Sequence, residues 1–119
     1  MTTQQIGARL AELCRTGQYE TAQKELYAED AVSIESQIMP GFAKETKGLD
    51  DIIKKGHAFE SMVDKIHGGS VSEPIVAGNA IAFIMSLDAT WKDGRRTNNE
   101  ELCVYEVKDG KIISEQFFA

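Results

Sequence analysis

Three turn-forming dipeptides divide the second half of this chain into short apolar runs. They are Gly78-Asn79, Asp93-Gly94 and Asp109-Gly110. Such pairs tolerate the left-handed backbone that a tight hairpin requires, so each predicts an antiparallel turn. The runs that they bound are rich in β-branched and aromatic residues, which favours strands. We therefore expect a meander of four strands, at residues 70–77, 80–91, 95–107 and 111–118.

The first half has the spacing of helices instead. Apolar side chains recur every three or four positions in residues 2–17, 18–30 and 49–66, which predicts three amphipathic helices. Gly56 lies inside the third of them, where glycine costs about 1 kcal/mol relative to alanine. We expect a close packing contact at Gly56 that explains its presence.

One further strand is expected between the second and third helices. Residues 31–39 alternate between apolar and polar, with Val32, Ile34 and Ile38 on one face, and residues 40–48 then read as a loop. The predicted order is α-α-β-α-β-β-β-β. Helices first and an antiparallel meander last indicate an α+β fold. We expect a strongly curved antiparallel sheet that forms a cone, with the three helices on its concave side and a cavity between the two layers.

Composition narrows the class of protein. The 119 residues suffice for one domain, 1–119, and the net charge of -6 argues against a nucleic-acid groove. No apolar run is long enough to span a membrane, and the amino-terminal residues lack the pattern of a secretion signal. Cys14 and Cys103 have no metal-binding spacing, and no glycine-rich phosphate loop occurs. The expectation is a cytoplasmic protein with two free thiols, no metal and no cofactor; a Cys14–Cys103 disulfide is the alternative for the thiols.

Two segments resemble a known family. The strings "LYAEDAVSIE" at residues 26–35 and "YEVKDGKIISEQFF" at residues 105–118 are similar to the SnoaL-like branch of the nuclear-transport-factor-2-like superfamily, which also includes ketosteroid isomerase and shares the cystatin-like fold. The resemblance extends over essentially the whole chain. It implies the cone-shaped fold, but this superfamily contains isomerases, dehydratases, cyclases, hydrolases and non-enzymatic binding proteins, so the fold does not determine the function.

The resemblance also gives Glu35 a candidate role. In the isomerase a carboxylate base follows the start of the first strand, and Glu35 falls at that position. The tyrosine and the protonated acid that complete the isomerase site fall on Leu10 and Cys103, so both donors are missing. Strict alternation places Glu35 opposite the face of Val32 and Ile34, which favours a solvent-facing side chain unless the strand is bulged.

Glu115 is an acid inside an apolar strand. An unpaired carboxylate is costly in a dry core, so Glu115 points either into a wet or ligand-filled cavity or toward the outer face of the sheet. The family pattern implies the cavity. The two possible inward sets are Ile113, Glu115 and Phe117, which the family pattern favours, or Ile112, Ser114 and Phe118.

For the preceding strand, at residues 95–107, the sequence also leaves open which face points inward. Glu101, Cys103 and Tyr105 share one face, while Leu102 and Val104 share the other. The family pattern sends the first set inward as ligand contacts, whereas apolarity alone sends the second. One bulge at a flanking turn reverses the assignment, so the sequence does not decide between them.

Other candidate ligand contacts lie near loops and helix ends. His57 is a candidate proton shuttle beside the apolar stripe of the third helix, and Phe59, Met62 and Trp91 are candidate pocket walls; ordinary packing is the alternative for each of them.

Two functions agree with these features. The first is a cofactor-independent isomerase or lyase that acts on a small hydrophobic molecule through Glu35 and Glu115; the second is a non-catalytic module that binds a ligand or a partner protein. A homodimer is expected in either case, because Ile84, together with Leu102 or Val104, would otherwise leave an apolar outer face of the sheet uncovered.

Overall fold

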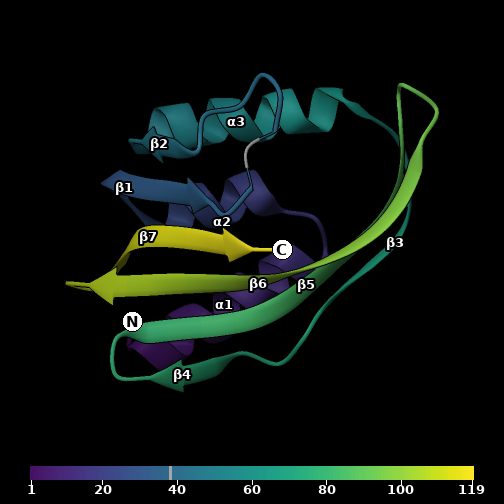
Figure 1. Ribbon diagram of the computed structural model, residues 1–119. Helices are drawn as coiled ribbons and strands as arrows, with labels where there is room; N and C mark the ends of the chain where they lie inside the picture. Colours follow the sequence, from purple (N-terminus) through teal and green to yellow (C-terminus); the bar gives the residue numbers. More distant parts are fainter. Residues whose placement is uncertain (38) are drawn as a thin grey trace.

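The computed structural model describes residues 1–37 and 39–119 and has three helices and a seven-stranded sheet (Figure 1). The strand order in the sheet is β2-β1-β7-β6-β5-β3, and β4 pairs with β5. The long strands β5 and β6 bend strongly, and the helices lie on the concave side of the sheet (Figure 1). The predicted α+β class with a curved sheet is confirmed. The elements along the chain are α1 (Thr3–Arg15), α2 (Tyr19–Leu26), β1 (Tyr27–Glu35), β2 (Glu45–Lys47), α3 (Leu49–Ser61), β3 (Val63–Val71), β4 (Ile75–Ala77), β5 (Ala80–Trp91), β6 (Arg96–Lys108) and β7 (Lys111–Phe118).

Local sequence signals account for α1. Thr2 and Gln5 form a reciprocal capping box at its start, in which each side chain accepts a hydrogen bond from the backbone of the other. The chain turns away after Arg15 through Gly17, whose φ of 73° suits glycine. The apolar face of α1 is buried in the core against the sheet, and none of the helices in the described part of the chain is long and apolar enough to cross a membrane.

The third helix is shorter than predicted. It ends at Ser61, and the following residues form β3, where Val63 pairs with Trp91 and Ile66 with Ala89. Pairing with a long neighbouring strand outweighs the helical spacing of these β-branched residues. The packing contact expected at Gly56 is also wrong, because a Cβ atom at that position would meet nothing within 4 Å.

The predicted hairpins are present. Asp109 and Gly110 both have positive φ, 52° and 76°, at the β6–β7 turn, and Gly94 has a φ of 92° at the β5–β6 turn. The expected strand at residues 70–77 is instead the end of β3 and a separate β4, because Pro74 interrupts the ladder between them. Two more features are missing from the prediction: β1 begins at Tyr27, and β2 lies within the expected loop.

The sheet is mixed rather than wholly antiparallel. The hairpins fix the direction of β7, and β1 occupies its free edge in the parallel sense, with Ser33 beside Glu115. This pairing joins the first strand to the last and places two polar side chains next to each other on the inner face.

A bulge in β7 settles which side chains face inward. Val107 pairs with Ile112 and Glu106 pairs with Ser114, so Ile113 is the extra residue. Ile112 and Glu115 therefore both face the helices, a combination that neither predicted set contained. On β6 the inward residues are Cys103 and Tyr105, both buried.

The outer face of the sheet carries apolar side chains. Ile84 pairs with Leu102, and Leu102 pairs with Phe118, so the three lie in one row. All three are exposed, at 41% to 47% of their surface. Val32 and Ile34, expected inside, are only half-buried, while Ser33 between them is fully buried. Ile38, expected on the same face as Val32 and Ile34, lies outside the described residues.

Candidate functional site

A buried carboxylate occupies the inner face where β1 meets β7. Glu115 is 3% exposed, and both of its oxygens accept hydrogen bonds: the Tyr27 hydroxyl donates to Oε1, and the Ser33 hydroxyl donates to Oε2 at 2.6 Å. Tyr27 begins β1 directly after α2, and Ser33 comes to Glu115 through the parallel strand pairing. The acid is thus satisfied by the protein itself, which reduces the cost of its burial.

Lys55 extends this network toward the solvent. Its ammonium nitrogen lies 2.6 Å from the Ser33 oxygen and 3.2 Å from Oε1 of Glu35. Its side chain is only 16% exposed, and the nitrogen stands 5.8 Å from the centre of the Phe117 ring. The helix α3 supplies Lys55, and β1 supplies both oxygen partners, so the contact ties the helix to the sheet. Glu35 therefore faces the helix, although its side chain is still 31% exposed. Alternation holds along β1, but the inner face is that of the buried Ser33 and not that of Val32 and Ile34, so the expected solvent-facing Glu35 is wrong.

Glu101 joins the same face of the sheet from β6. No hydrogen bond or ion pair holds its carboxyl group within residues 1–37 and 39–119. Burial, followed by the negative charges of Glu35 and Glu115, raises the pKa of Glu101 to about 7, and Lys55 opposes that rise. A carboxyl group with this pKa exchanges its proton close to neutral pH.

Glu115 and Tyr27 also have raised pKa values. Burial raises the pKa of Glu115, against the hydrogen bonds from Ser33 and Tyr27 and the charge of Lys55. Burial and the neighbouring Glu115 carboxylate raise the pKa of Tyr27 well above its usual range. We call Glu35, Lys55, Glu101 and Glu115, with Ser33 and Tyr27, the acid–base cluster.

The structure separates the remaining candidate ligand contacts from this cluster. The Phe59 and Trp91 rings pack edge to face, 5.2 Å apart, where the end of α3 meets the end of β5, and Met62 follows α3 there. The Trp91 indole donates to the Thr97 hydroxyl at 2.8 Å. His57 contacts Glu20 on the exposed side of α2.

Cys103 and Tyr105 line the inner face as buried neighbours of the cluster. The Tyr105 ring lies 5.4 Å from the Phe83 ring and 6.5 Å from the Phe117 ring, so these aromatic side chains form one wall. Both cysteines are free, and burial raises the pKa of Cys14 to about 12, which keeps this thiol protonated and unreactive.

Three members of the cluster escaped prediction, although the sequence holds a signal for two. Lys55 lies three positions after Ile52 and four before Phe59, so a cation interrupts the apolar stripe of α3. Ser33 lies two positions before Glu35, hence on the same face of a strand. Tyr27 carried no signal, because the predicted second helix included it.

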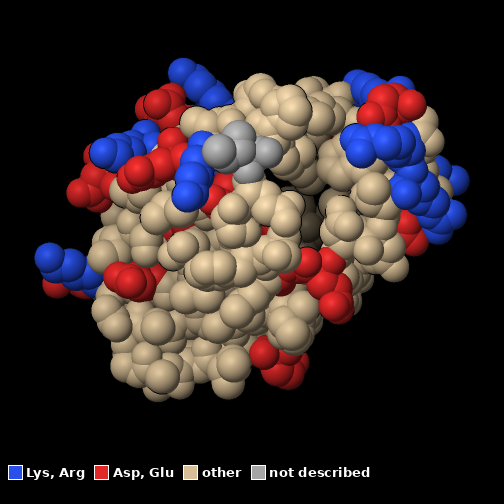
Figure 2. Space-filling model, in the orientation of Figure 1, with Lys and Arg blue, Asp and Glu red and all other residues tan. Residues whose placement is uncertain are grey.

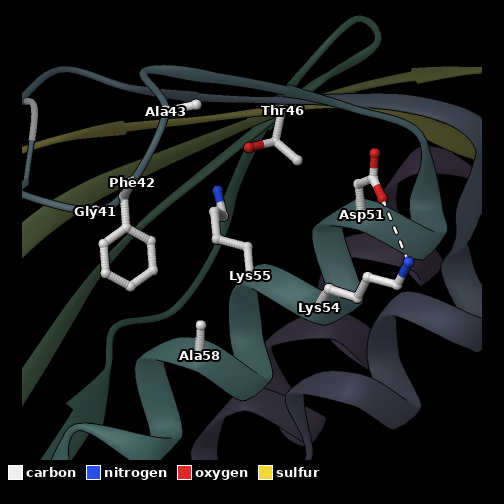
Figure 3. Close-up of a pocket in the computed structure, with 8 residues that line it drawn as sticks. All are labelled: Gly41, Phe42, Ala43, Thr46, Asp51, Lys54, Lys55 and Ala58. Atoms are coloured by element: carbon white, nitrogen blue, oxygen red, sulfur yellow. Dashed lines mark ion pairs between the residues drawn. The ribbon is translucent and has the colours of Figure 1, made fainter.

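In the part of the chain that the structure describes, two pockets open on the surface. One, of about 280 Å³, lies between the segment 41–46 and α3, with Phe42, Thr46 and Lys55 around it (Figure 3). The other, of about 260 Å³, lies on the outer face of the sheet near Ser70 and Asp88. In the space-filling view the face shown is also hollowed near its middle, with acidic side chains along one edge (Figure 2). Over the described ranges, no three His, Cys, Asp or Glu side chains are grouped so that they could hold a metal ion.

Comparisons with known proteins agree with this architecture. A family model described as the SnoaL-like domain matches residues 1–119. The structure is similar to that of a proposed SnoaL-like polyketide cyclase from Mesorhizobium loti, with 31% sequence identity, a TM-score of 0.92 and full coverage of both chains. No curated protein matches the sequence.

More distant structures share the fold. A protein of unknown function with a cystatin-like fold from Xanthomonas campestris has a TM-score of 0.82 at 13% identity, over 99% of this chain and 90% of that one. TerC, co-crystallised with polyporic acid, has a TM-score of 0.78 at 16% identity, over 99% of this chain and 92% of that one. The family model and the 31% identity over the whole length show that the chain belongs to the SnoaL-like domain family.

Proposed function

We propose that this protein is a cofactor-independent isomerase or lyase that moves a proton on a small hydrophobic molecule. The observation that carries the proposal is the Glu101 carboxyl group, whose pKa is raised to about 7 and which has no partner among the described residues. A general base works best when its pKa lies near the operating pH. The ligand bound by the similar TerC, polyporic acid, supports a small organic substrate.

The roles in the cluster follow from its contacts. Glu101 accepts the proton, because Glu115 is already bonded at both oxygens by Tyr27 and Ser33. Lys55 places a positive charge beside the site and stabilises negative charge that develops on the substrate. Glu35 holds the Lys55 ammonium group in place at 3.2 Å. Glu115 is therefore not the base. It accepts a hydrogen bond from Ser33, which in turn contacts Lys55, and so it helps to position Lys55.

A generic proton-abstraction probe tests this proposal without knowledge of the substrate. Nitrobenzisoxazole opens to a coloured cyanophenolate when a base removes its carbon-bound proton, and a carboxylate in an apolar environment is an effective base for that step. We expect the protein to accelerate this ring opening beyond an equal concentration of acetate. The rate should rise with pH and level off above the pKa of Glu101 at about 7, because the deprotonated carboxylate is the active form.

Adjacent carboxylates on opposite faces of β6 provide a matched comparison. Glu101→Gln should lower the rate at least about tenfold, the lower end of what a positioned base contributes. Glu100 is exposed on the outer face, opposite Ser86, and Glu100→Gln should leave the rate unchanged. Equal rates for the two variants, or a rate without dependence on pH between about 5 and 8, would contradict a base at Glu101.

A non-catalytic binding module is the second candidate, and one observation favours it. The most deeply buried acid, Glu115, is fully occupied by hydrogen bonds within the protein, as a structural residue would be. Such a module would bind a compound such as polyporic acid but would open nitrobenzisoxazole no faster than acetate does. Calorimetric titration together with the rate measurement separates the two functions.

We also propose a homodimer through the outer face of the sheet. Ile84, Leu102 and Phe118 form one exposed apolar row, and Ile75 on β4 is 71% exposed. A second copy that covers this row would remove it from water. Light scattering at micromolar concentration should give about twice the chain mass of 13.1 kDa. Leu102→Glu should shift the mass to that of one chain; a parent protein at 13.1 kDa would contradict the dimer.

A further inference from the structure

The pocket between the segment 41–46 and α3 contains side chains that the acid–base chemistry does not use. Its volume is about 280 Å³, and neither Glu101 nor Glu115 lines it. Small-molecule sites begin at about 300 Å³, so this space suits a ligand of a single ring with one small substituent. The pocket is therefore a candidate for a second site, which shares Lys55 with the acid–base cluster.

The walls of this pocket divide by chemistry. Phe42 presents its ring on one side, and Ala58 adds an apolar surface from α3 (Figure 3). Lys55 extends from α3 into the space between Phe42 and Thr46, while Lys54 turns along the helix toward Asp51 (Figure 3). An apolar ring surface therefore adjoins a group of hydrogen-bond donors.

The donor capacity of Lys55 is not fully used. An ammonium group has three N–H bonds, and the acceptors seen for Lys55 are the Ser33 hydroxyl at 2.6 Å and the Glu35 carboxylate at 3.2 Å. No third acceptor lies within reach in the part of the chain that the structure describes. Because the Lys55 side chain is only 16% exposed, an acceptor on a ligand in the pocket would satisfy a donor that is poorly hydrated.

We propose that this pocket binds a small aromatic carboxylate, with the ring against Phe42 and the carboxylate accepting a hydrogen bond from Lys55. The second lysine favours an anion as well. Lys54 lies 3.9 Å from the Asp51 carboxylate, and both groups are largely exposed, so this pair is weak and Lys54 can turn toward the ligand. A cationic ligand would find Asp51 as its sole carboxylate among the residues that line the pocket, already opposite Lys54.

A ligand bound in this pocket would also change the electrostatic environment of the acid–base cluster. Lys55 contacts Glu35 and Ser33 on its inner side, so an anion bound on its outer side competes for the same positive charge. The charge of Lys55 opposes the raised pKa of Glu101. A bound carboxylate would therefore weaken the effect of Lys55 on Glu101, the base of the proposed function.

Benzoate is the probe for this site. We expect benzoate, added to the intact protein, to raise the melting temperature by an amount that grows with the logarithm of its concentration above the dissociation constant, because a ligand that binds only the native state stabilises it. Benzyl alcohol, which keeps the ring without the charge, should give no such rise. Phe42→Ala should weaken benzoate binding about tenfold through loss of the ring contact, and Lys54→Gln about threefold, as expected for an exposed charge.

The matched control is Lys92→Gln, which removes the same charge from the exposed β5–β6 turn and should leave benzoate affinity unchanged. Equal rises with benzyl alcohol, or the same affinity in Phe42→Ala, Lys54→Gln and the parent, would overturn the proposed site. Carbon NMR of the ring then reports contact with the protein directly if melting curves of a variant are poorly resolved. Since the readout is binding, its failure would leave the ring-opening assay at Glu101 unaffected.

Discussion

Lys55→Met should destabilise the protein by about 2–3 kcal/mol near pH 8, which lowers the melting temperature by about 10 °C. Methionine keeps most of the length of the side chain and its apolar packing on α3 but removes the charge that faces Glu35. Removing one partner of a buried ion pair costs about 3–5 kcal/mol. The loss is smaller here because Glu35 is 31% exposed, so water partly screens the pair. The measurement is chemical denaturation of parent and variant.

The destabilisation by Lys55→Met should shrink toward pH 5. The pKa of Glu101 in the folded protein, about 7, lies above its ordinary value, so the contribution of Glu101 to stability is complete at low pH and is lost as pH rises through 7. Lys55 lowers the pKa of both Glu101 and Glu115, so its removal raises both further and increases the loss at high pH. At pH 5 Glu101 is protonated and no longer requires the cation.

The neighbouring Lys54 supplies the control for this experiment. It is 78% exposed, so Lys54→Met should change stability by no more than about 0.5 kcal/mol at either pH. A destabilisation by Lys55→Met that is equal at pH 5 and pH 8 would show that the side chain contributes packing alone, and that the charge coupling to the carboxyl groups is absent.

Phe83→Ala should cost about 3–5 kcal/mol, the largest effect expected for a single substitution in this chain. Phe83 is 1% exposed, lies on the inner face of β5 and contacts the Tyr105 ring. Its removal leaves a cavity within the aromatic wall that borders the acid–base cluster. Denaturation midpoints at pH 5 and pH 8 should fall by similar amounts, because Phe83 carries no charge; this distinguishes the substitution from Lys55→Met.

Phe83→Leu is a milder substitution at the same position and provides a comparison for Phe83→Ala. Leucine keeps most of the buried volume, so the cost should fall to about 1.5 kcal/mol or less. If alanine cost no more than leucine, the core around Phe83 would have collapsed around the smaller side chain, and the aromatic wall would not depend on it.

The sequence predicts the architecture well because each element carries its own local signal. Turn dipeptides correctly predicted the hairpins, and helical spacing correctly predicted α1. The errors arise where a distant strand overrides a local preference: residues 63–66 have helical spacing, but pairing with β5 makes them a strand. Similarly, the parallel contact of β1 with β7 joins segments with no local sign of each other.

The candidate site was predicted only in part, for a related reason. The resemblance pointed to Glu35, Glu101 and Glu115, which all belong to the cluster. The placement of Glu115 and Glu35 depends on a bulge at Ile113 and on the register between β1 and β7, and periodicity alone does not specify either one. His57, Phe59, Met62 and Trp91 have the residue types of a ligand site but lie at other places in the fold.

The parallel β1–β7 pair has a consequence for how the domain assembles during synthesis. Ser33 and Glu115 are 82 positions apart in sequence, yet they share a hydrogen bond. A nascent chain that has emerged only through β6 lacks the strand that joins β1 to the meander, and its unpaired edges are open to wrong partners. Because β1 pairs with β7, the polar network between them cannot form until β7 is available. Folding of the amino-terminal half before β7 is available should therefore yield a species that binds chaperones and exposes Lys55 to water.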